Sequence, residues 1–431
     1  MSDARIRLNP TPLADAERRA ILANPVFGQV FTDHMVTMEY RNGAWGPLEL
    51  KPFAPLVLSP ATLALHYGQS IFEALKAYSL GGHTAGAADG TADDTADDTA
   101  GDTADDTAGD TGEGIAALFR PDQNEARFAT SARRIAIPEL PEGVFGLGCA
   151  LLAGADRAWI PSEDGAALYV RPFIFGSEAH LSVRPAEEYL FVIIASPVAS
   201  YFGEHLSAIT VGVEAIDVRA TPGGTGAVKF AGNYAAGFAA HRRAGAAGYD
   251  QVLWLDADEH RWVEELNAMN VFFVWRRDGR TVVTTPPLAG TILAGVTRDS
   301  LLSLAADAVA GRPGGEVAVG AESVDEAAVG IDEVAVERTS IEMIRAGAAD
   351  GSLVEMFACG TAAVIAPIGT VVDDGRPLTV GTGEPGPVTI RLRRSLLDVQ
   401  QGLAADPHEW MVPVADLLQS HGVDPADLRA V

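Results

Sequence analysis

The sequence predicts a mixed α/β protein of two domains with much antiparallel pairing. Runs rich in β-branched and aromatic residues, such as 167–175 and 189–196, are not separated by a regular succession of helices, which argues against a doubly wound parallel sheet. The segment SPVASYFG at 196–203 then brings Pro, Ser and Gly together, as is typical of a boundary. The chain has 431 residues, 48% of them hydrophobic, which is enough for two packed cores. We expect a small first domain over 1–200, a linker over 201–207 and a larger second domain over 208–431.

The first domain shows one hairpin and one helix clearly. Asn42 and Gly43 lie between two strand-like segments, and both residues tolerate the positive φ that a tight hairpin needs. The segment SARRIAIP at 131–138 has a helical pattern that Pro138 is expected to stop.

An acidic low-complexity segment interrupts the first domain at 83–114. From Thr91 it reads TADD TADD TAGD TADD TAGD TGEG, without a large apolar side chain, so burial cannot offset the chain entropy and we expect a disordered surface loop. Its flanks, LKAYSLGG and IAALFRPD, have strand patterns, which places the segment at a hairpin tip. A calcium site is the alternative, although the spacing fits neither an EF-hand loop nor a glycine-rich nonapeptide repeat.

The second domain is expected to mix strands and helices. A strand at 209–218 and a glycine-rich turn precede a helix through NYAAGFAAHRRAG at 233–245, and the strand QVLWL follows. The β-rich segments WVEELNAMNVFFVW and TVVTT are joined by Asp278-Gly279, another hairpin signal. Residues 306–333 are rich in Ala, Gly, Val and Glu and suggest a second poorly ordered excursion.

Composition excludes several classes of function. A net charge of −27 repels phosphates, so neither nucleic acid nor an acidic membrane surface is an expected partner. The two cysteines, Cys149 and Cys359, show no metal-ligand spacing, and no metal site is expected. The first residues lack an apolar signal region and no apolar run is long enough for a membrane span, so we expect a cytoplasmic protein.

Lys229 is the most informative single residue. Of the 31 Lys and Arg residues only Lys51, Lys76 and Lys229 are lysines, and the last lies among small and apolar neighbours in VKFAGNYAAG. Burial penalises an ammonium group, and the neutral amine is a nucleophile for carbonyls, whereas arginine is not. The alternative is a lysine that extends its amine from the edge of the core into water. TPGGTGAVKF is not a phosphate-binding P-loop, because Gly does not precede the lysine and neither Ser nor Thr follows it.

Eight segments resemble, in the same order, the successive blocks of branched-chain amino-acid aminotransferases. They are HYGQSIFEALKAY (66–78), NEARFATSARRIAIPELP (124–141), LYVRPFIF (168–175), VKFAGNYAAG (228–237), QVLWLD (251–256), EELNAMNVFFV (264–274), TPPLAGTILAGVTRDSLL (285–302) and EMFACGTAAVIAPIG (355–369). The resemblance runs from about residue 35 to residue 370. It implies pyridoxal 5'-phosphate as cofactor and the fold known as type IV, with a small α/β first domain and a barrel-like core in the second.

The resemblance also implies roles around the cofactor. Lys229 would be the catalytic lysine that bonds to the cofactor and moves the substrate's α-proton, and Glu265 would keep the pyridine nitrogen protonated. Tyr234 would contact the phenolic oxygen of the ring. The phosphate would be held by Arg127, by the backbone amides of Val296 and Thr297 at a helix N-terminus, and by Thr361.

Substrate contacts implied by the resemblance come from both domains. Tyr67, Phe72 and Tyr169 resemble the aromatic walls around a branched side chain, and Arg171 lies where the family engages the acidic co-substrate. Thr361 and the amide of Ala362 would meet the substrate α-carboxylate. Some of these residues reach the neighbouring subunit's site in the family, which implies a homodimer.

Two departures accompany the resemblance. Asn267 stands where glycine is common and Ala268 where threonine is often found, so hydrogen bonds near Glu265 are expected to change.

We interpret the chain as an enzyme that moves an amino group between L-leucine, L-isoleucine or L-valine and 2-oxoglutarate. The alternatives are another type IV enzyme, such as a D-amino-acid aminotransferase or an aminodeoxychorismate lyase, and a non-enzymatic cation-binding protein that acts through the acidic repeat. The preferred substrate and the metabolic direction do not follow from the sequence.

Overall fold

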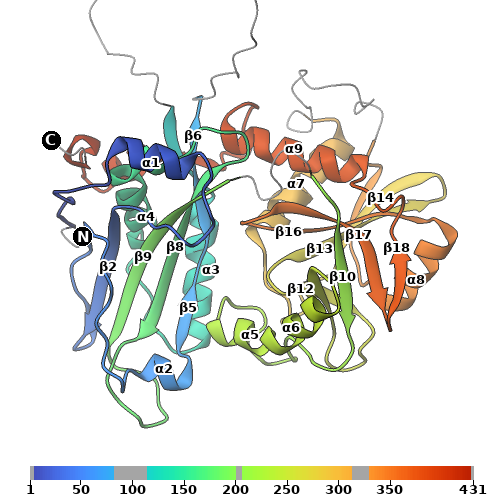
Figure 1. Ribbon diagram of the computed structural model, residues 1–431, viewed down its shortest axis with the longest axis horizontal. Helices are drawn as coiled ribbons and strands as arrows, with labels where there is room; N and C mark the ends of the chain where they lie inside the picture. The colour runs from blue at the N-terminus through green and yellow to red at the C-terminus, as the bar shows by residue number, and fades with distance from the viewer. Residues whose placement is uncertain (1–3, 82–113, 200–205, 313–329, 429–431) are drawn as a thin grey trace, which may run out of the picture.

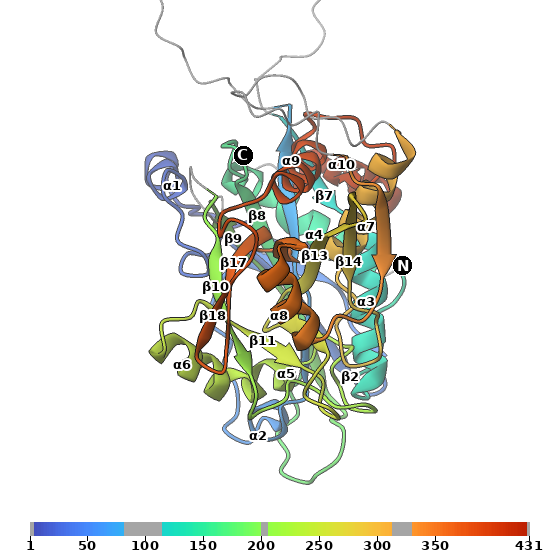
Figure 2. The same cartoon turned by 90° about the vertical axis from the view of Figure 1, so that its right-hand side faces the viewer.

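Two lobes stand side by side in the computed structural model, which describes residues 4–81, 114–199, 206–312 and 330–428 (Figure 1). Each lobe is built on one large sheet. Figure 2 views the molecule from the side of the second lobe, where the chain's later elements come to the front. Within the described residues, no helix is long and apolar enough to cross a membrane. A cytoplasmic location stays a prediction.

The first lobe contains a ten-stranded, mostly antiparallel sheet in the order β1-β4-β2-β9-β8-β6-β7-β19, with β3 and β5 paired beside this path. Its strands are β1 (Arg5–Ile6), β2 (His34–Arg41), β3 (Ala44–Trp45), β4 (Glu49–Pro52), β5 (Ser70–Phe72), β6 (Leu75–Leu80), β7 (Ile115–Phe119), β8 (Ala167–Gly176), β9 (Tyr189–Val198) and β19 (Met411–Pro413). Its helices are α1 (Asp15–Leu22), α2 (Leu63–Tyr67), α3 (Pro121–Arg134), α4 (Val144–Ala155) and α10 (Val414–Ser420), with short 3₁₀ turns η1 (Arg157–Trp159) and η3 (Pro425–Leu428).

Helix α4 forms the centre of the first core. Its sequence VFGLGCALLAGA is apolar on every side, and residues 144–153 are all buried, as expected of a helix enclosed on all faces. The helix packs on β2, β8 and β9. Gly148 is required at the contact, because a Cβ there would lie 2.7 Å from Ile193 Cδ1.

The second lobe closes its sheet into a barrel. The strands are β10 (Ile209–Glu214), β11 (Gln251–Leu255), β12 (Val263–Leu266), β13 (Asn270–Arg277), β14 (Arg280–Thr285), β15 (Glu333–Val336), β16 (Leu353–Gly360), β17 (Val364–Asp373) and β18 (Arg376–Thr379). Because β12 pairs with both β11 and β13, six of them form a ring in the order β12-β11-β10-β17-β16-β13. Apolar side chains such as Leu253, Phe273 and Val371 form one buried cluster with neighbours from the same strands. The barrel-like core implied by the resemblance is therefore confirmed.

Five helices surround the barrel: α5 (Ala231–Ala236), α6 (Phe238–Ala246), α7 (Val296–Ala310), α8 (Ile341–Asp350) and α9 (Pro387–Gln401). Helices α7 and α9 pack on each other, and with β13 and β16 they contribute to a cluster shared with Ala74, Tyr78 and Tyr169 of the first lobe. Helix α8 lies on the outer side of the second lobe, away from the first (Figures 1 and 2). The two lobes thus share an apolar core at their contact.

The predicted hairpins are confirmed. Asn42 and Gly43 both have positive φ, 54° and 79°, in the turn between β2 and β3, and Asp278 and Gly279 repeat this between β13 and β14 at 51° and 78°. The strand patterns that flank the acidic segment form the antiparallel pair β6 and β7, with Leu80 opposite Ile115. The disorder predicted for 83–114 falls almost wholly outside the described residues.

Several elements differ from the expectation, and the helix expected at 131–138 is only the last turn of α3, which ends at Arg134, before Pro138. The helix predicted at 233–245 is two helices, because the chain breaks at Gly237, where a Cβ would lie 3.3 Å from Asn267 Oδ1 and 3.4 Å from Trp254. Residues 306–310 continue α7, and Ile331 is buried. The boundaries expected for the poorly ordered stretch, 306–333, were therefore wrong at both ends.

The last elements of the chain, β19 and α10, pack on the first lobe, unlike the expected second domain over 208–431. Strand β19 pairs with β7 of the first sheet, and α10 packs on α4. The first lobe therefore includes residues from both ends of the chain (Figure 1). The linker expected at 201–207 stays a prediction, because 200–205 lie outside the described residues.

We expect deletion of residues 84–112 to leave folding nearly unchanged. Leu80 and Ile115 are directly paired, so the five remaining residues can close the hairpin, and a shorter loop changes the free energy of unfolding by under about 1 kcal/mol. Melting curves with and without millimolar calcium test this. A calcium-dependent rise in melting temperature confined to the full-length protein would instead favour a cation-binding role for the segment.

Candidate active site

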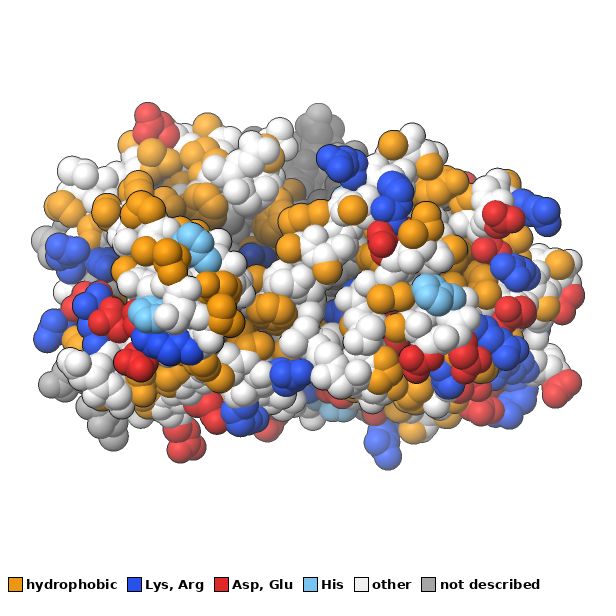
Figure 3. All heavy atoms as spheres, turned by 90° about the horizontal axis from the view of Figure 1, so that it is seen from below, with side chains coloured by type: hydrophobic (Ala, Val, Ile, Leu, Met, Phe, Trp, Pro, Cys, Tyr) orange, Lys and Arg blue, Asp and Glu red, His pale blue; other side chains and the backbone are white. Residues whose placement is uncertain are grey.

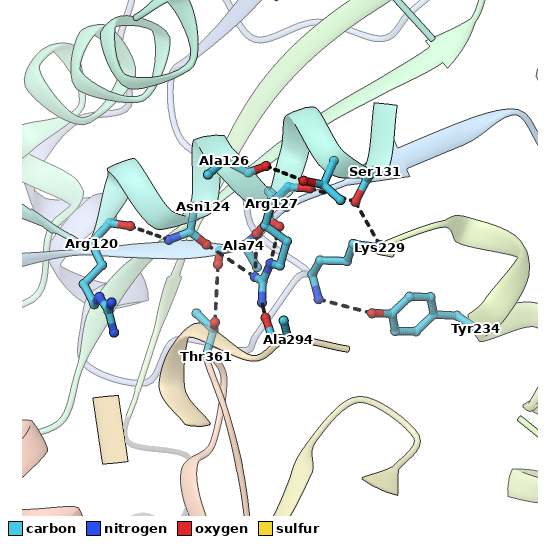
Figure 4. A network of polar contacts seen from close by, with 12 residues as sticks. Ala74, Arg120, Asn124, Ala126, Arg127, Ser131, Lys229, Tyr234, Ala294 and Thr361 are labelled. Atoms are coloured by element: carbon cyan, nitrogen blue, oxygen red, sulfur yellow. Dashed lines mark hydrogen bonds and ion pairs between the residues drawn. The ribbon is translucent and has the colours of Figure 1, made fainter. Parts of the chain in front are cut away.

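The backbone of Lys229 is held by the first lobe. Its N–H donates to Ser131 Oγ on α3 at 3.0 Å, and its carbonyl accepts a hydrogen bond from Phe72 N at 3.1 Å (Figure 4). Phe230 forms an isolated bridge with Ile71 of β5. Lys229 itself belongs to the chain segment between β10 and α5 of the second lobe, so both lobes fix its position.

The Lys229 amine lies in an aromatic pocket and is 9% exposed. Its Nζ donates to the Tyr234 hydroxyl at 3.1 Å and lies 4.8 Å from the centroid of the Phe72 ring (Figure 4). Asn233 steadies this arrangement, because its Nδ2 donates to the carbonyls of Thr225 and Val228 at 2.8 and 2.9 Å. One turn of α5 thereby positions the tyrosine opposite the lysine.

Glu265 is a buried carboxylate on β12, 2% exposed. Asn270 Nδ2 donates to its Oε2 at 3.1 Å across the β12–β13 hairpin, and Arg219 Nη2 lies 2.5 Å from Oε1. Burial raises the pKa of Glu265 to about 7, against the opposing charges of Arg219 and Lys229.

Arg219 is itself fixed by backbone carbonyls. Its Nη1 donates to Thr291 O at 2.9 Å and its Nη2 to Gly226 O at 3.2 Å. Gly226 is required here, because a Cβ would lie 2.3 Å from Thr291 O. The glycine-rich loop before Lys229 therefore anchors the cation that faces Glu265.

Arg127 on α3 is paired with a fully buried acid. Its Nε and Nη2 donate to the two oxygens of Glu73 at 2.6 and 2.8 Å, and its Nη1 donates to Ala294 O at 2.9 Å (Figure 4). Burial lowers the pKa of Arg127, but the charge of Glu73 outweighs it and the net shift is upward. Arg127 thus stays a cation beside the start of α7.

The first turn of α7 offers backbone donors next to Arg127. The helix runs for 15 residues from Val296, and its N-cap, Gly295, provides no side-chain acceptor for the first amides. A Cβ at Gly295 would lie 2.0 Å from Asn270 Oδ1, so only glycine allows this close approach. Val296 and Thr297 are both buried.

Thr361 and Ala362 form the turn between β16 and β17. Thr361 Oγ1 donates to Ala74 O at 3.3 Å, and Ala362 O accepts from Lys76 Nζ at 3.1 Å. Val296, Thr297 and Thr361 line one cavity between the lobes, together with Ala74 and Lys76. The structure thus brings these three predicted phosphate contacts together.

Three of the four predicted side-chain pocket residues form one cluster. The Arg171 guanidinium carbon lies 4.8 Å from the Phe72 ring centroid, and Arg171 Nη2 donates to the Tyr169 hydroxyl at 2.9 Å. The ring of Phe27 packs edge-on against Tyr169 at 4.9 Å. Tyr67 lies apart from this cluster: its hydroxyl donates to Leu181 O at 2.5 Å and its side chain is 42% exposed.

Asn267, which replaces the family's glycine, points away from Glu265. Its Oδ1 accepts from Trp254 Nε1 at 2.8 Å, and its Nδ2 lies 3.1 Å from His241 Nδ1. Asn267 in place of glycine therefore adds polar contacts from the β12–β13 hairpin to β11 and α6. Ala268 lies on the other side, with its carbonyl beside Gly360.

The residues fit pyridoxal phosphate. A buried amine, a carboxylate paired with arginine, and a guanidinium beside uncapped amides are the groups that this cofactor's aldehyde, pyridine nitrogen and phosphate require, as nucleophile, acceptor and donors respectively.

Sequence reasoning missed several residues of the site. Glu73, Ser131, Arg219 and Phe27 contact residues that it did identify, and Lys76 lines the cavity. For Lys76 the sequence contained one indication of a special role, because it is one of only three lysines in the chain.

Comparisons with known proteins agree with this geometry. Residues 113–369 match the family model for class IV amino-transferases. The chain is 44% identical over 419 residues to a probable branched-chain-amino-acid aminotransferase of Streptomyces coelicolor, covering 96% of this chain and 100% of that protein. Among solved structures, the Escherichia coli branched-chain amino acid aminotransferase superposes with a TM-score of 0.62 at 23% identity, covering 89% of this chain and 99% of that one. The T.th. branched-chain amino acid aminotransferase with pyridoxamine 5'-phosphate gives a TM-score of 0.60 at 25% identity, covering 88% and 98%.

We expect Arg219→Met to move the acid limb of the activity-versus-pH profile to higher pH. Arg219 lowers the pKa of Glu265, so its loss raises that pKa further and the carboxyl stays protonated at a pH where the parent is ionised. The shift should be about one pH unit or more. Arg219→Lys keeps the charge and should shift the limb less. A uniform loss of activity with an unshifted profile would contradict this role.

Proposed function

The chain belongs to the branched-chain amino-acid aminotransferases of class IV, and we propose on this basis that it moves amino groups between branched-chain amino acids and 2-oxoglutarate with pyridoxal phosphate. The observation that carries the proposal is the hydrogen bond between the Lys229 amine and Tyr234, in a structure that also pairs Glu265 with Arg219 and places Arg127 beside the start of α7. A D-amino-acid aminotransferase or lyase activity is less well supported, since the curated relatives at 36–44% identity are named as branched-chain enzymes.

Each residue has a separate task in this proposal. When bound, pyridoxal phosphate supplies a carbonyl for the amino group and a ring that accepts electrons from Cα. The Lys229 amine would accept the α-proton at Nζ and pass it on within the same half of the cycle, and in the second half it would move a proton in the reverse direction, to Cα of the new amino acid. The Tyr234 hydroxyl orients that amine through their hydrogen bond. Glu265 supplies negative charge at the far end, and Asn270 with Arg219 fixes its carboxylate.

The remaining residues bind and orient. Arg127, the Val296 and Thr297 amides and Thr361 are proposed to hold the phosphate. The substrate carboxylate is assigned to Thr361 and the Ala362 amide. Phe72 and Tyr169 enclose the aliphatic side chain. Arg171 meets the second carboxylate of 2-oxoglutarate, because its Nε is buried and has no partner among the described residues.

We expect Lys229→Ala to reduce transamination at least about a thousandfold, because one change removes both the cofactor's anchor and the base. The parent should show a visible absorbance band that falls on adding L-leucine and returns on adding 2-oxoglutarate. Circular dichroism should show an intact fold, and Lys51→Ala, a lysine outside the site, is the matched control. Parent-like turnover by Lys229→Ala would refute the assignment.

We also propose that the protein acts as a homodimer through the surface around α2. Val57, Leu65, Leu181 and Val183 are 97%, 63%, 61% and 86% exposed. Hydrogen bonds from Leu63 N to Glu178 O and from His180 N to Ala61 O bring the two segments together. Figure 3 views this underside of the molecule, where hydrophobic side chains gather over the first lobe. A second copy is the favoured occupant, because Tyr67 lies on this surface and could then complete the partner's site.

We expect Val57→Lys and Val183→Lys to shift the protein from dimer to monomer in sedimentation experiments. Activity should fall with the dimer fraction, since each site would lose residues supplied across the interface. Val309→Lys changes a valine that is 44% exposed at the end of α7 and should leave the assembly unchanged. A parent protein that is monomeric and fully active would overturn the proposal.

A further inference from the structure

Glu264 is a buried carboxylate next to Glu265 that the mechanism above does not use. It lies on β12 and is 7% exposed. Its Oε1 accepts a hydrogen bond from Thr291 Oγ1, whereas its Oε2 is buried and has no hydrogen-bond partner among the described residues. A buried acceptor without a partner costs free energy, so stability alone gives little reason for a carboxylate at this position.

Thr291 begins a short segment, residues 291–294, that leads into α7 and contacts the site through its backbone. Three carbonyls of this segment accept hydrogen bonds from site side chains, each at 2.9 Å: Thr291 O from Arg219, Leu293 O from Asn270 and Ala294 O from Arg127. The 291–294 segment thus holds both partners of Glu265 and the arginine predicted to bind phosphate.

The position of Arg219 depends on the first residue of this segment. Thr291 is 3% exposed, and a Cβ at Gly226 would lie 2.3 Å from Thr291 O. Arg219 donates to both of these residues, to Thr291 O at 2.9 Å and to Gly226 O at 3.2 Å. A rotation of the Thr291 peptide would therefore remove one of the two carbonyls that direct Arg219 toward Glu265.

The charge of Arg219 matters because Glu265 is buried. Burial raises the pKa of Glu265. The other influences on it come from Arg219, the Leu293 amide and Lys229, which lower this pKa, and from Glu264, which raises it. The Cys359 thiol on β16, whose pKa burial raises, is neutral and adds no charge. Displacement of Arg219 therefore raises the pKa of Glu265, and the carboxylate is protonated at a higher pH.

We propose that Glu264 and Thr291 are positioning residues for the carboxylate that meets the cofactor's pyridine nitrogen: their hydrogen bond fixes the 291–294 segment, whose first carbonyl holds Arg219 against Glu265. This rests on the proposed function. Neither residue contacts the reacting atoms in this proposal, and both act through Arg219.

The test measures binding of pyridoxamine 5'-phosphate, which cannot bond covalently to Lys229, to the cofactor-free protein. Tryptophan fluorescence gives the dissociation constant as a function of pH, and ionised Glu265 favours binding because it attracts the pyridinium. In Thr291→Val, which removes the hydroxyl and keeps the shape, we expect the acid side of this curve to move to higher pH by about half a pH unit. Thr291→Ser keeps the hydroxyl and should restore the parent curve.

Glu264 is tested with two substitutions that both remove its charge. Glu264→Gln keeps an acceptor for the Thr291 hydroxyl and Glu264→Leu does not, so the Glu264→Leu curve should lie about half a pH unit above the Glu264→Gln curve. Thr291→Val should add no further shift to Glu264→Leu, because the two changes remove the same hydrogen bond.

Thr389→Val is the matched control. It removes another buried threonine–glutamate hydrogen bond of the second lobe, from Thr389 Oγ1 to Glu355 Oε2 at 2.7 Å, and should lower the melting temperature without moving the binding curve. The proposal is wrong if the Thr291→Val curve does not shift, or if Thr291→Ser or Thr389→Val shifts equally. Because the readout is cofactor binding, a protein that does not transaminate L-leucine would refute the proposed function and leave this result intact.

Discussion

The two hydrogen bonds on the backbone of Lys229 are the constraint on which the site depends. Ser131 and Phe72, both from the first lobe, fix the peptide groups of a residue that belongs to the second. The Lys229 side chain then donates a hydrogen bond to Tyr234 of its own lobe. The site therefore exists only where the lobes are in contact, and the apolar cluster shared between β6, α7 and α9 is a requirement for catalysis as well as for stability.

The buried arginines and the buried lysines near the site have different kinds of partner. Two buried carboxylates near the site are each paired with an arginine: Glu73 with Arg127, and Glu265 with Arg219. A guanidinium keeps its proton and can form two parallel hydrogen bonds, which suits a fixed charge in a low dielectric. The two buried lysines contact neutral oxygens instead, a hydroxyl for Lys229 and a carbonyl for Lys76.

Local sequence signals predicted much of the fold, but less of the site. The Asn42-Gly43 and Asp278-Gly279 turns and the start of α7 follow from residue types at adjacent positions, and the structure contains them. The barrel closure, by contrast, requires β12 to pair on both sides, and no local pattern encodes that. Lys229, Glu265 and Arg127 were predicted from the family resemblance. Ser131 and Glu73 were not, because their partners are 98 and 54 positions away and nothing in a single sequence links them.

The return of the C-terminal segment to the first lobe bears on how the chain folds during synthesis. Strand β7 is made early, but its outer neighbour β19 lies almost three hundred residues later in the sequence, and α10 then covers α4. The first lobe emerges from the ribosome with one sheet edge and part of its core uncovered while the whole barrel is still being translated. Such long-range pairing slows the final step of folding. Nascent chains released before residue 411 would expose that edge of β7, which makes it the natural target for a chaperone or, in its absence, for aggregation.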